Sequence, residues 1–267
     1  MTRKLLAVTV ALLPLVAVIA CGGGEAPPAE APAAATPAAA AGGEMIDPAT
    51  LTDAGGVAGS VQFAGSDPEL QVIQMAADPY CLSSHSDEVV AQRVMVNANG
   101  TLAEIFVYVK EGLEGKSFPV PSEVVGLDQV GCIYTPHVVG LQTGQTLQVK
   151  NSDDTLHNVN CQPTVDGNQP FNIGQPFAGI APHETTFPNP EIMIPVRCDV
   201  HPWMSAFIGV VPHPYFTITD AEGNFSIDRL PPGDYVLEAW SEGLGTETIN
   251  VTVSPNETAE ASFTFGG

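Results

Sequence analysis

Short apolar runs separated by polar and turn-forming residues recur along the chain from about residue 55 and predict β-strands. The clearest run is 103–110, where Ile, Phe, Val and Tyr follow an Asn-Ala-Asn-Gly turn at 97–100. Further strands are expected at 57–63, 94–96, 146–151, 184–187, 192–197 and 207–211. We find no convincing long amphipathic helix, so the pattern indicates an all-β fold built as sandwiches or barrels.

The amino-terminal 43 residues have a different pattern. Arg3 and Lys4 precede an apolar run at 5–19, which is short for a membrane crossing and typical of a secretory signal. The small residue before Cys21 makes this segment resemble the lipobox of bacterial lipoproteins, in which the cysteine is lipidated. Residues 22–43 are rich in Gly, Ala and Pro and predict a disordered tether. We therefore expect an exported protein, lipid-anchored to a bacterial membrane and facing the periplasm or the cell surface.

Acidic residues outnumber basic ones, with 30 Asp and Glu against 8 Lys and Arg and a formal net charge of −22. Such a surface repels nucleic acid and favours a partner with a basic docking face, through an attraction that salt screens. The alternative is that the acidity only keeps a surface protein soluble. We expect no nucleic-acid partner and a monomeric protein.

A soft-metal ligand set lies in seven residues, where Cys198, His201 and Met204 follow one another at intervals of three. Copper that changes oxidation state favours one thiolate, two imidazoles and a weak axial sulfur, so a second histidine is required. His157, in the polar segment 151–159, is the candidate. Taken singly, these residues have plainer roles as half of a disulfide, a surface histidine or a core side chain. Together they predict one mononuclear copper site.

The order of these residues also carries a family resemblance. A strand at 146–151 leads through a polar loop to His157 and Asn158, and a strand at 192–197 ends at Cys198. Residues 140–211 thereby resemble the second half of a cupredoxin, the fold of plastocyanin and amicyanin, with a ligand loop as short as that of amicyanin.

The resemblance implies a Greek-key β-sandwich that holds one copper ion, Cu(I) or Cu(II), at one end. It implies copper ligation by His157, Cys198, His201 and Met204. It also implies that Asn158 ties the two ligand-bearing loops together by hydrogen bonds. In cupredoxins the exposed edge of the ligand-loop histidine is the electron port, so Pro202 and Trp203 are expected to form an apolar docking patch beside it.

Three more cysteines need partners, namely Cys81, Cys132 and Cys161. Export favours disulfides, and Cys81 with Cys132 is the bridge we prefer. Cys161 is then a buried thiol, with a bridge to either of the other two as the competing interpretation.

A second metal site is a less favoured alternative. His85 follows Cys81 closely and His137 follows Cys132, as a Cys2His2 site would require. Zinc binding needs both thiols reduced, whereas export favours their oxidation.

The last fifty residues repeat a strand-turn-strand pattern at 217–227 and 230–240. This part, about 213–267, resembles the regulatory-like domain of carboxypeptidases, a small transthyretin-like β-sandwich. The opening strand of that family is missing just upstream. Either the strand after Met204 serves both modules, or 57–63 returns to complete the sheet. The module carries no evident catalytic set, so we expect a structural role.

The expected organisation is a lipoprotein signal peptide, a lipidated cysteine with its tether, a cupredoxin-like domain with an amino-terminal β extension, and a carboxypeptidase regulatory-like domain, at 1–20, 21–55, 56–212 and 213–267. Families of this architecture are sometimes labelled methylamine-utilisation-like, although nothing in the chain indicates amine chemistry. We expect a membrane-tethered type 1 copper protein that carries single electrons between redox proteins and is not an enzyme. The alternatives are a copper-binding or delivery protein, a structural surface lipoprotein and, less favoured, a red-copper-type enzyme.

Overall fold

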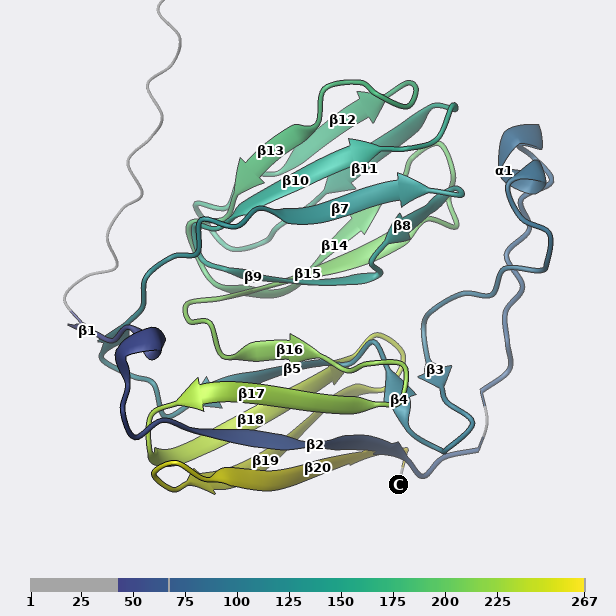
Figure 1. The fold of residues 1–267 in the computed structure, drawn as a ribbon. Coiled ribbons are helices and arrows are strands. Elements are labelled where there is room, and N and C mark those ends of the chain that lie inside the picture. The colour runs from purple at the N-terminus through teal and green to yellow at the C-terminus, as the bar shows by residue number, and fades with distance from the viewer. Residues whose placement is uncertain (1–42, 67, 267) are drawn as a thin grey trace, which may run out of the picture. The chain divides into compact units, whose positions relative to one another are not determined.

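The computed structural model describes residues 43–66 and 68–266. The expected signal peptide, Cys21 and residues 22–42 of the expected tether lie outside these residues. Residues 43–55, also expected in the tether, instead contain a short strand at Glu44–Met45 and a 3-10 turn at Pro48–Thr50. The described residues form one compact unit, which is nearly all β, as expected from the sequence (Figure 1). Within the described residues, no helix combines the length and the apolar character needed to cross a membrane.

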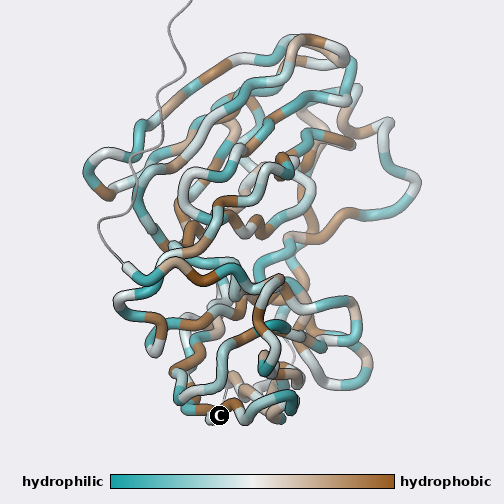
Figure 2. Tube along the Cα trace, turned by 60° about the vertical axis from the view of Figure 1, so that its left-hand side comes forward, coloured by the Kyte–Doolittle hydropathy of each residue, from teal (hydrophilic) through white to brown (hydrophobic). Residues whose placement is uncertain are grey.

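The first sandwich contains the strands between residues 125 and 211. One sheet has the order β13-β10-β7-β8 and the other the order β12-β11-β14-β15-β9. Their bounds are β7 (Val125–Val130), β8 (Ile133–Thr135), β9 (Val138–Gln142), β10 (Thr146–Asn151), β11 (His157–Cys161), β12 (Phe171–Gln175), β13 (His183–Thr186), β14 (Glu191–Arg197) and β15 (Ser205–Val211). Alternate side chains point inward, so Leu147 and Val149 of β10 are buried while Lys150 is exposed. Figure 2 shows hydrophobic and hydrophilic positions interspersed along the chain.

The second sandwich combines strands from both ends of the described chain. Its sheets have the orders β16-β5-β18-β19 and β17-β2-β20. Their bounds are β2 (Gly55–Phe63), β5 (Phe106–Glu111), β16 (Phe216–Ile218), β17 (Asn224–Leu230), β18 (Gly233–Ser241), β19 (Gly245–Val253) and β20 (Thr258–Phe265). The remaining elements are the pair β1 (Glu44–Met45) and β6 (Lys116–Ser117), the pair β3 (Met95–Val96) and β4 (Leu102–Ala103), a 3-10 turn at Pro48–Thr50 and the short helix α1 (Pro79–Ser83).

This arrangement corrects the expected domain boundaries. β2 and β5 were expected in the copper domain, yet β2 lies between β17 and β20, and β5 lies between β16 and β18. The return of 57–63 is therefore the alternative that completes the second sandwich. An apolar strand pattern identifies a strand but not its partner, because pairing across some 200 residues leaves no local mark in the sequence.

The two sandwiches share an apolar cluster of buried residues within this compact unit. It contains Phe106 and Tyr108 of β5, Val138, Met193 and Val211. Gly209 of β15 permits the close approach, because a Cβ there would lie 2.8 Å from atoms of both Met193 and Phe106. The sandwiches thus pack directly on each other.

Candidate metal centre

Three of the four predicted ligands meet at one end of the first sandwich. The ligand atoms of His157, Cys198 and His201 all lie within 4.8 Å of one another, and these residues are 0%, 2% and 3% exposed. His157 begins β11, and Cys198 follows β14 directly. Because Asn160 pairs with Arg197 across these strands, the sheet itself brings His157 beside the loop that carries the other two residues.

Backbone hydrogen bonds shape the loop from Cys198 to Met204. The Cys198 N–H donates to the Met204 carbonyl (3.2 Å), and the Met204 N–H donates to the His201 carbonyl (3.0 Å). The Cys198 Sγ accepts from the N–H groups of His201 (3.3 Å) and Asn158 (3.4 Å). Met204, which is 1% exposed, belongs to the same core cluster as Cys198. The loop therefore presents its thiol sulfur in a fixed position.

Asn158 links the two ligand-bearing segments. Its side-chain oxygen accepts from the Asp199 N–H (2.6 Å), directly after Cys198, and its amide donates to Asn172 on β12. Asp199 in turn accepts from Asn160 and Asn172. These bonds are the inter-loop contacts that the resemblance implies for Asn158.

Both imidazoles point the same nitrogen into the centre. The Nδ1 atoms of His157 and His201 lie 2.9 Å apart. On the opposite side, His157 Nε2 lies 2.8 Å from Asp153 Oδ2 and His201 Nε2 lies 3.0 Å from Asp78 Oδ2. A carboxylate accepts the proton of each Nε2, which fixes the ring orientation and turns each Nδ1 toward the other and the sulfur.

Electrostatics favour the thiolate form of Cys198 and, in the metal-free chain, the protonated form of His157. Although burial opposes ionisation, hydrogen bonds from His157 and from backbone N–H groups lower the pKa of the Cys198 thiol. Burial likewise opposes charge on His157, but Asp153 and Cys198 raise its pKa to about 8. Burial also opposes ionisation of the Asp153 carboxyl, but hydrogen bonds from His157 and from two backbone N–H groups lower its pKa.

This donor set fits a soft cation. Two nitrogen lone pairs that face each other at 2.9 Å beside a thiolate repel one another unless a cation lies among them. In the metal-free chain, a proton on His157 supplies this positive charge. A thiolate with two imidazoles, and a methionine in the same loop, is the set that copper prefers.

Two carboxylates at this centre were missed from the sequence. Asp153 lies four residues before His157 in a loop, and in a loop this spacing does not predict which way the two side chains point. Asp78 lies more than 120 residues from His201. The Asp78-Pro79 pair does signal a helix start, and Asp78 caps α1 by accepting from the N–H groups of Tyr80 and Cys81. Its contact with His201 could be recognised only from the tertiary structure.

The expected exposed edge of His201 is wrong. The imidazole is 3% exposed because Asp78 lies against Nε2, and Cys81 Sγ is 3.7 Å from the same nitrogen. Trp203 is half-buried, stacks on His201 with ring centroids 5.0 Å apart, and donates from Nε1 to the Cys132 carbonyl (3.0 Å). Pro202 is exposed. Of the two residues expected to form a docking patch, only Pro202 is thus freely presented to solvent.

The remaining cysteines and histidines have other partners. Cys81 and Cys132 form a disulfide, which is the pairing preferred from the sequence. Cys161 is a buried free thiol, and burial, with a smaller effect of Glu191, raises its pKa to about 12.

The possible second metal site of Cys81, His85, Cys132 and His137 is not formed. The disulfide leaves no thiolate there, and His85 Nε2 lies 2.6 Å from the Gly131 carbonyl. His137 pairs with Glu242 instead (2.8 Å) and bonds the Ser205 carbonyl. Sequence proximity to a cysteine therefore did not place either histidine beside a sulfur.

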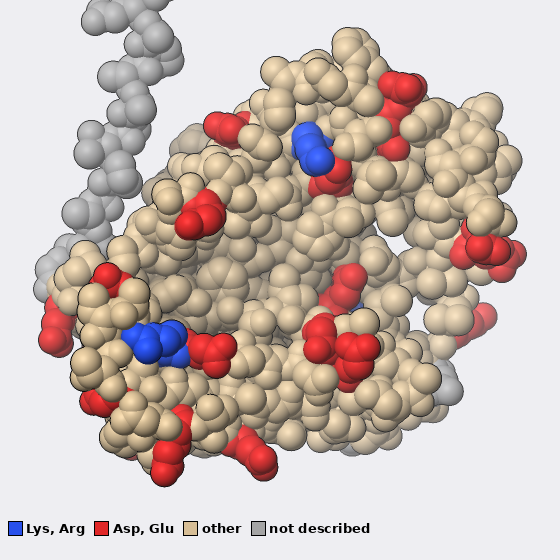
Figure 3. Space-filling view, in the orientation of Figure 1, with Lys and Arg blue, Asp and Glu red and all other residues tan. Residues whose placement is uncertain are grey.

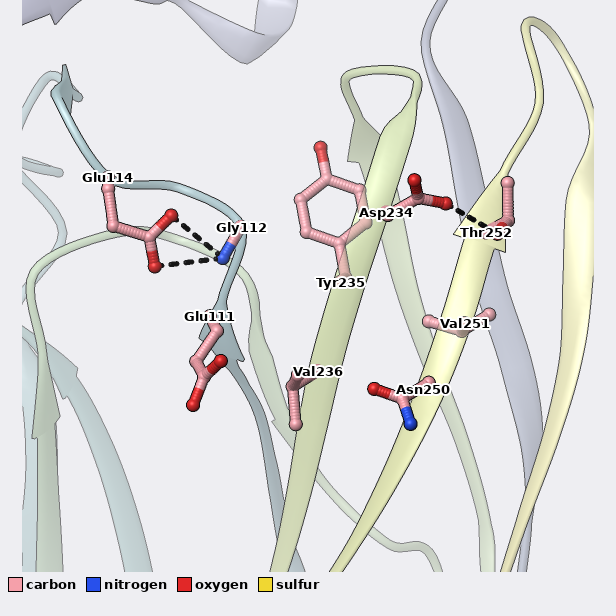
Figure 4. A pocket seen from close by; sticks show the side chains of 9 residues that line it. All are labelled: Glu111, Gly112, Glu114, Asp234, Tyr235, Val236, Asn250, Val251 and Thr252. Carbon is pink, nitrogen blue, oxygen red and sulfur yellow. Dashed lines mark hydrogen bonds between the residues drawn. The ribbon is translucent and has the colours of Figure 1, made fainter.

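A surface hollow of about 570 Å³ lies on the second sandwich, between β5, β18 and β19 (Figure 4). Two of its carboxylates are already engaged, since Glu114 accepts from the Gly112 N–H and Asp234 accepts from the Thr252 hydroxyl. The hollow shares no residue with the His and Cys cluster.

Comparisons with known proteins bear on both sandwiches. The family model of the carboxypeptidase regulatory-like domain matches residues 206–266, which confirms that part of the resemblance. The match begins within β15, a strand of the first sandwich. No curated protein matches the chain.

Similar solved structures include copper proteins. A Cu-containing nitrite reductase from Thermus scotoductus SA-01 is 22% identical over 39% of this chain, with a TM-score of 0.30, and the match spans 25% of that enzyme's length. A Cu(I) amicyanin mutant is 20% identical over 34% of this chain and 85% of its own, with a TM-score of 0.29. A purple cupredoxin from Nitrosopumilus maritimus is 20% identical over 32% of this chain and 98% of its own, with a TM-score of 0.26. The chain is thus an all-β protein with cupredoxins among its structural neighbours and a carboxypeptidase regulatory-like match at its carboxyl-terminal end.

Proposed function

We propose that this chain is a mononuclear type 1 copper protein that carries single electrons between redox partners. The observation that carries the proposal is the convergence of two imidazole Nδ1 atoms and the Cys198 sulfur in a buried cluster. His157, Cys198 and His201 would hold the ion, and Met204 of the same loop would be the fourth ligand. Bound copper supplies one-electron chemistry by alternating between Cu(I) and Cu(II).

The surroundings of the ligands support electron transfer over the alternatives. Both Nε2 atoms donate to carboxylates, and two backbone N–H groups donate to the sulfur. These bonds hold the metal-binding atoms in place, so a change of oxidation state needs little rearrangement. A copper-delivery protein needs an accessible site from which the ion is released, whereas these ligands are 0–3% exposed. An enzyme needs an open coordination position, which the same burial disfavours.

The test compares two buried cysteines of the same chain. We expect residues 44–267 to bind one copper ion with an intense blue thiolate band and a narrow copper hyperfine splitting. Cys198→Ser removes the thiolate and should abolish the band. Cys161→Ser is the matched control, because Cys161 is equally buried but lies outside the cluster. A colourless wild-type protein, or a blue serine variant at 198, would contradict the proposal.

We further propose a basic redox partner. The chain carries a net charge of −22, and Asp and Glu far outnumber Lys and Arg on the face shown in Figure 3. Electrostatic steering then accelerates association, and salt slows it. Electron-transfer rates with a cationic test partner should fall as ionic strength rises. An electron-transfer rate that does not depend on salt would contradict a basic partner and leave the acidic residues with a role in solubility alone.

Export and lipid anchoring at Cys21 complete the proposal. The order of basic, apolar and small residues before Cys21 supports a lipoprotein signal. The Cys81–Cys132 disulfide supports an oxidising compartment. In a bacterial host, the wild-type chain should incorporate labelled palmitate and fractionate with membranes, whereas Cys21→Ser should do neither.

A further inference from the structure

A segment from the second sandwich covers the metal end of the first. Residues 71–91, here called the α1 strap, leave after β2 and return before β3. Backbone hydrogen bonds from Ile73 to Val89 (2.8 Å) and from Ala91 to Gln71 (2.9 Å) hold the two arms of the strap together. Residues 78–84 at its tip contain α1 and its two caps.

The tip is fastened to the metal end at three points. The Cys81–Cys132 disulfide is covalent. Tyr80 donates its hydroxyl to Asp153 Oδ1 (3.3 Å), and the other oxygen of Asp153 accepts from His157. Asp78 lies against His201. The strap thus reaches the outer side of both ligand histidines.

Asp78 divides its two oxygens between helix and ligand. Oδ1 accepts from the Tyr80 N–H (2.8 Å) and the Cys81 N–H (3.3 Å) at the start of α1, while Oδ2 faces His201 Nε2 at 3.0 Å. The helix cap therefore fixes where the second oxygen lies. The disulfide in turn fixes the helix, since Cys81 is the third residue of α1.

We propose that Asp78 is a positioning residue for the copper ligand His201, and that the disulfide-fastened α1 strap closes the metal centre against solvent and metal exchange. This rests on the proposed copper site. The carboxylate holds the imidazole with Nδ1 toward the ion and places a negative charge near it, which stabilises Cu(II) relative to Cu(I). An open strap would expose the edge of His201.

A first experiment needs no copper. In the metal-free full chain, modification by diethylpyrocarbonate, mapped by mass spectrometry, should be slow at His201 and fast at the half-buried His183. In the Cys81→Ala/Cys132→Ala variant, His201 should react at least about tenfold faster. His213, which is buried in the second sandwich, should stay protected and so report an intact fold. Unchanged protection of His201 in this variant would overturn closure by the disulfide.

A second experiment uses the copper form. Asn is as good a helix N-cap as Asp, so Asp78→Asn keeps α1 but removes the charge. We expect copper loss to a chelator to be about 10- to 100-fold faster and the reduction potential to rise, with partial rescue by Asp78→Glu. Asp87→Asn is the matched control, because Asp87 is exposed on the same strap and bonds only the neighbouring Ser86.

The outcomes separate the two proposals. If the wild-type chain binds no copper, the proposed function fails, and the modification of His201 still decides whether the strap closes the centre. If copper binds with a blue thiolate band but Asp78→Asn behaves as Asp87→Asn does in release rate and potential, the positioning role of Asp78 is wrong.

Discussion

At the scale of single residues, histidines in this chain take roles that depend on what each ring nitrogen contacts. His157 and His201 each present Nδ1 to the centre and Nε2 to a carboxylate. His213, in contrast, accepts the Tyr215 N–H at Nδ1 (3.3 Å) and lies with Nε2 2.8 Å from the Val109 carbonyl. A buried ring bonded in this way is neutral, because protonation would remove the acceptor.

The buried state of His213 predicts a pH-dependent stability. Burial lowers its pKa to about 4 from 6.5, so between these values the unfolded chain takes up a proton that the folded chain does not. Its contribution to the free energy of unfolding is complete above pH 6.5 and falls by about 3 kcal/mol by pH 4. In urea unfolding, His213→Gln should therefore lose less free energy of unfolding than the wild type between pH 7 and pH 4, by about the same amount. An equal loss of unfolding free energy in the wild type and in His213→Gln would refute the assignment.

The ligand residues and their supports differ in how far the sequence predicts them. Cys198, His201 and Met204 lie in one loop, where a spacing of three restricts which atoms can meet. Asp78 reaches His201 only because a strap and a disulfide bring it there. No local pattern encodes such a contact.

At the scale of elements, β2 is the strand on which the second sandwich depends. It pairs in parallel with β20 from Gly56–Thr258 to Phe63–Phe265 and antiparallel with β17. Gly59 lies directly against β20, since a Cβ there would be 1.4 Å from the Ala261 carbonyl oxygen. A side chain at this position must move the backbone of β20.

Gly59→Ala should therefore destabilise the protein by about 3 kcal/mol, measured by urea or thermal unfolding. The matched control is Gly126→Ala on β7, where nothing lies within 4 Å of the added Cβ. That variant should change stability by no more than about 0.5 kcal/mol. Equal effects of the two substitutions would show that β2 and β20 are not packed as described.

At the scale of the whole molecule, the two sandwiches are not successive segments of the chain. Strands β2 and β5 come from the amino-terminal side of the first sandwich and are central strands of the second. The strap that covers the His and Cys cluster follows β2 of the second sandwich and returns before the separate β3-β4 pair. The segment that reaches His201 thus leaves from β2, a strand that completes the carboxyl-terminal sandwich.

Residues 213–267 should consequently not fold alone. Without β2, β17 and β20 have no partner between them, and without β5, β16 loses its partner. The isolated fragment should lack dispersed amide resonances and a cooperative thermal transition, both of which residues 44–267 should show. Cooperative unfolding of the fragment would contradict the shared-strand arrangement.

The sequence by itself determined the all-β class, most strand positions and the candidate ligands beside Cys198 in its loop, because alternation and short-range spacing act within one strand or loop. It also favoured the Cys81–Cys132 bridge. Only the tertiary structure decided that β2 and β5 complete the second sandwich, that His201 is covered, and that Asp78 and Asp153 hold the two imidazoles. These contacts join residues in loops or on strands distant in sequence, and their partners are set by packing of the whole chain, not by local pattern.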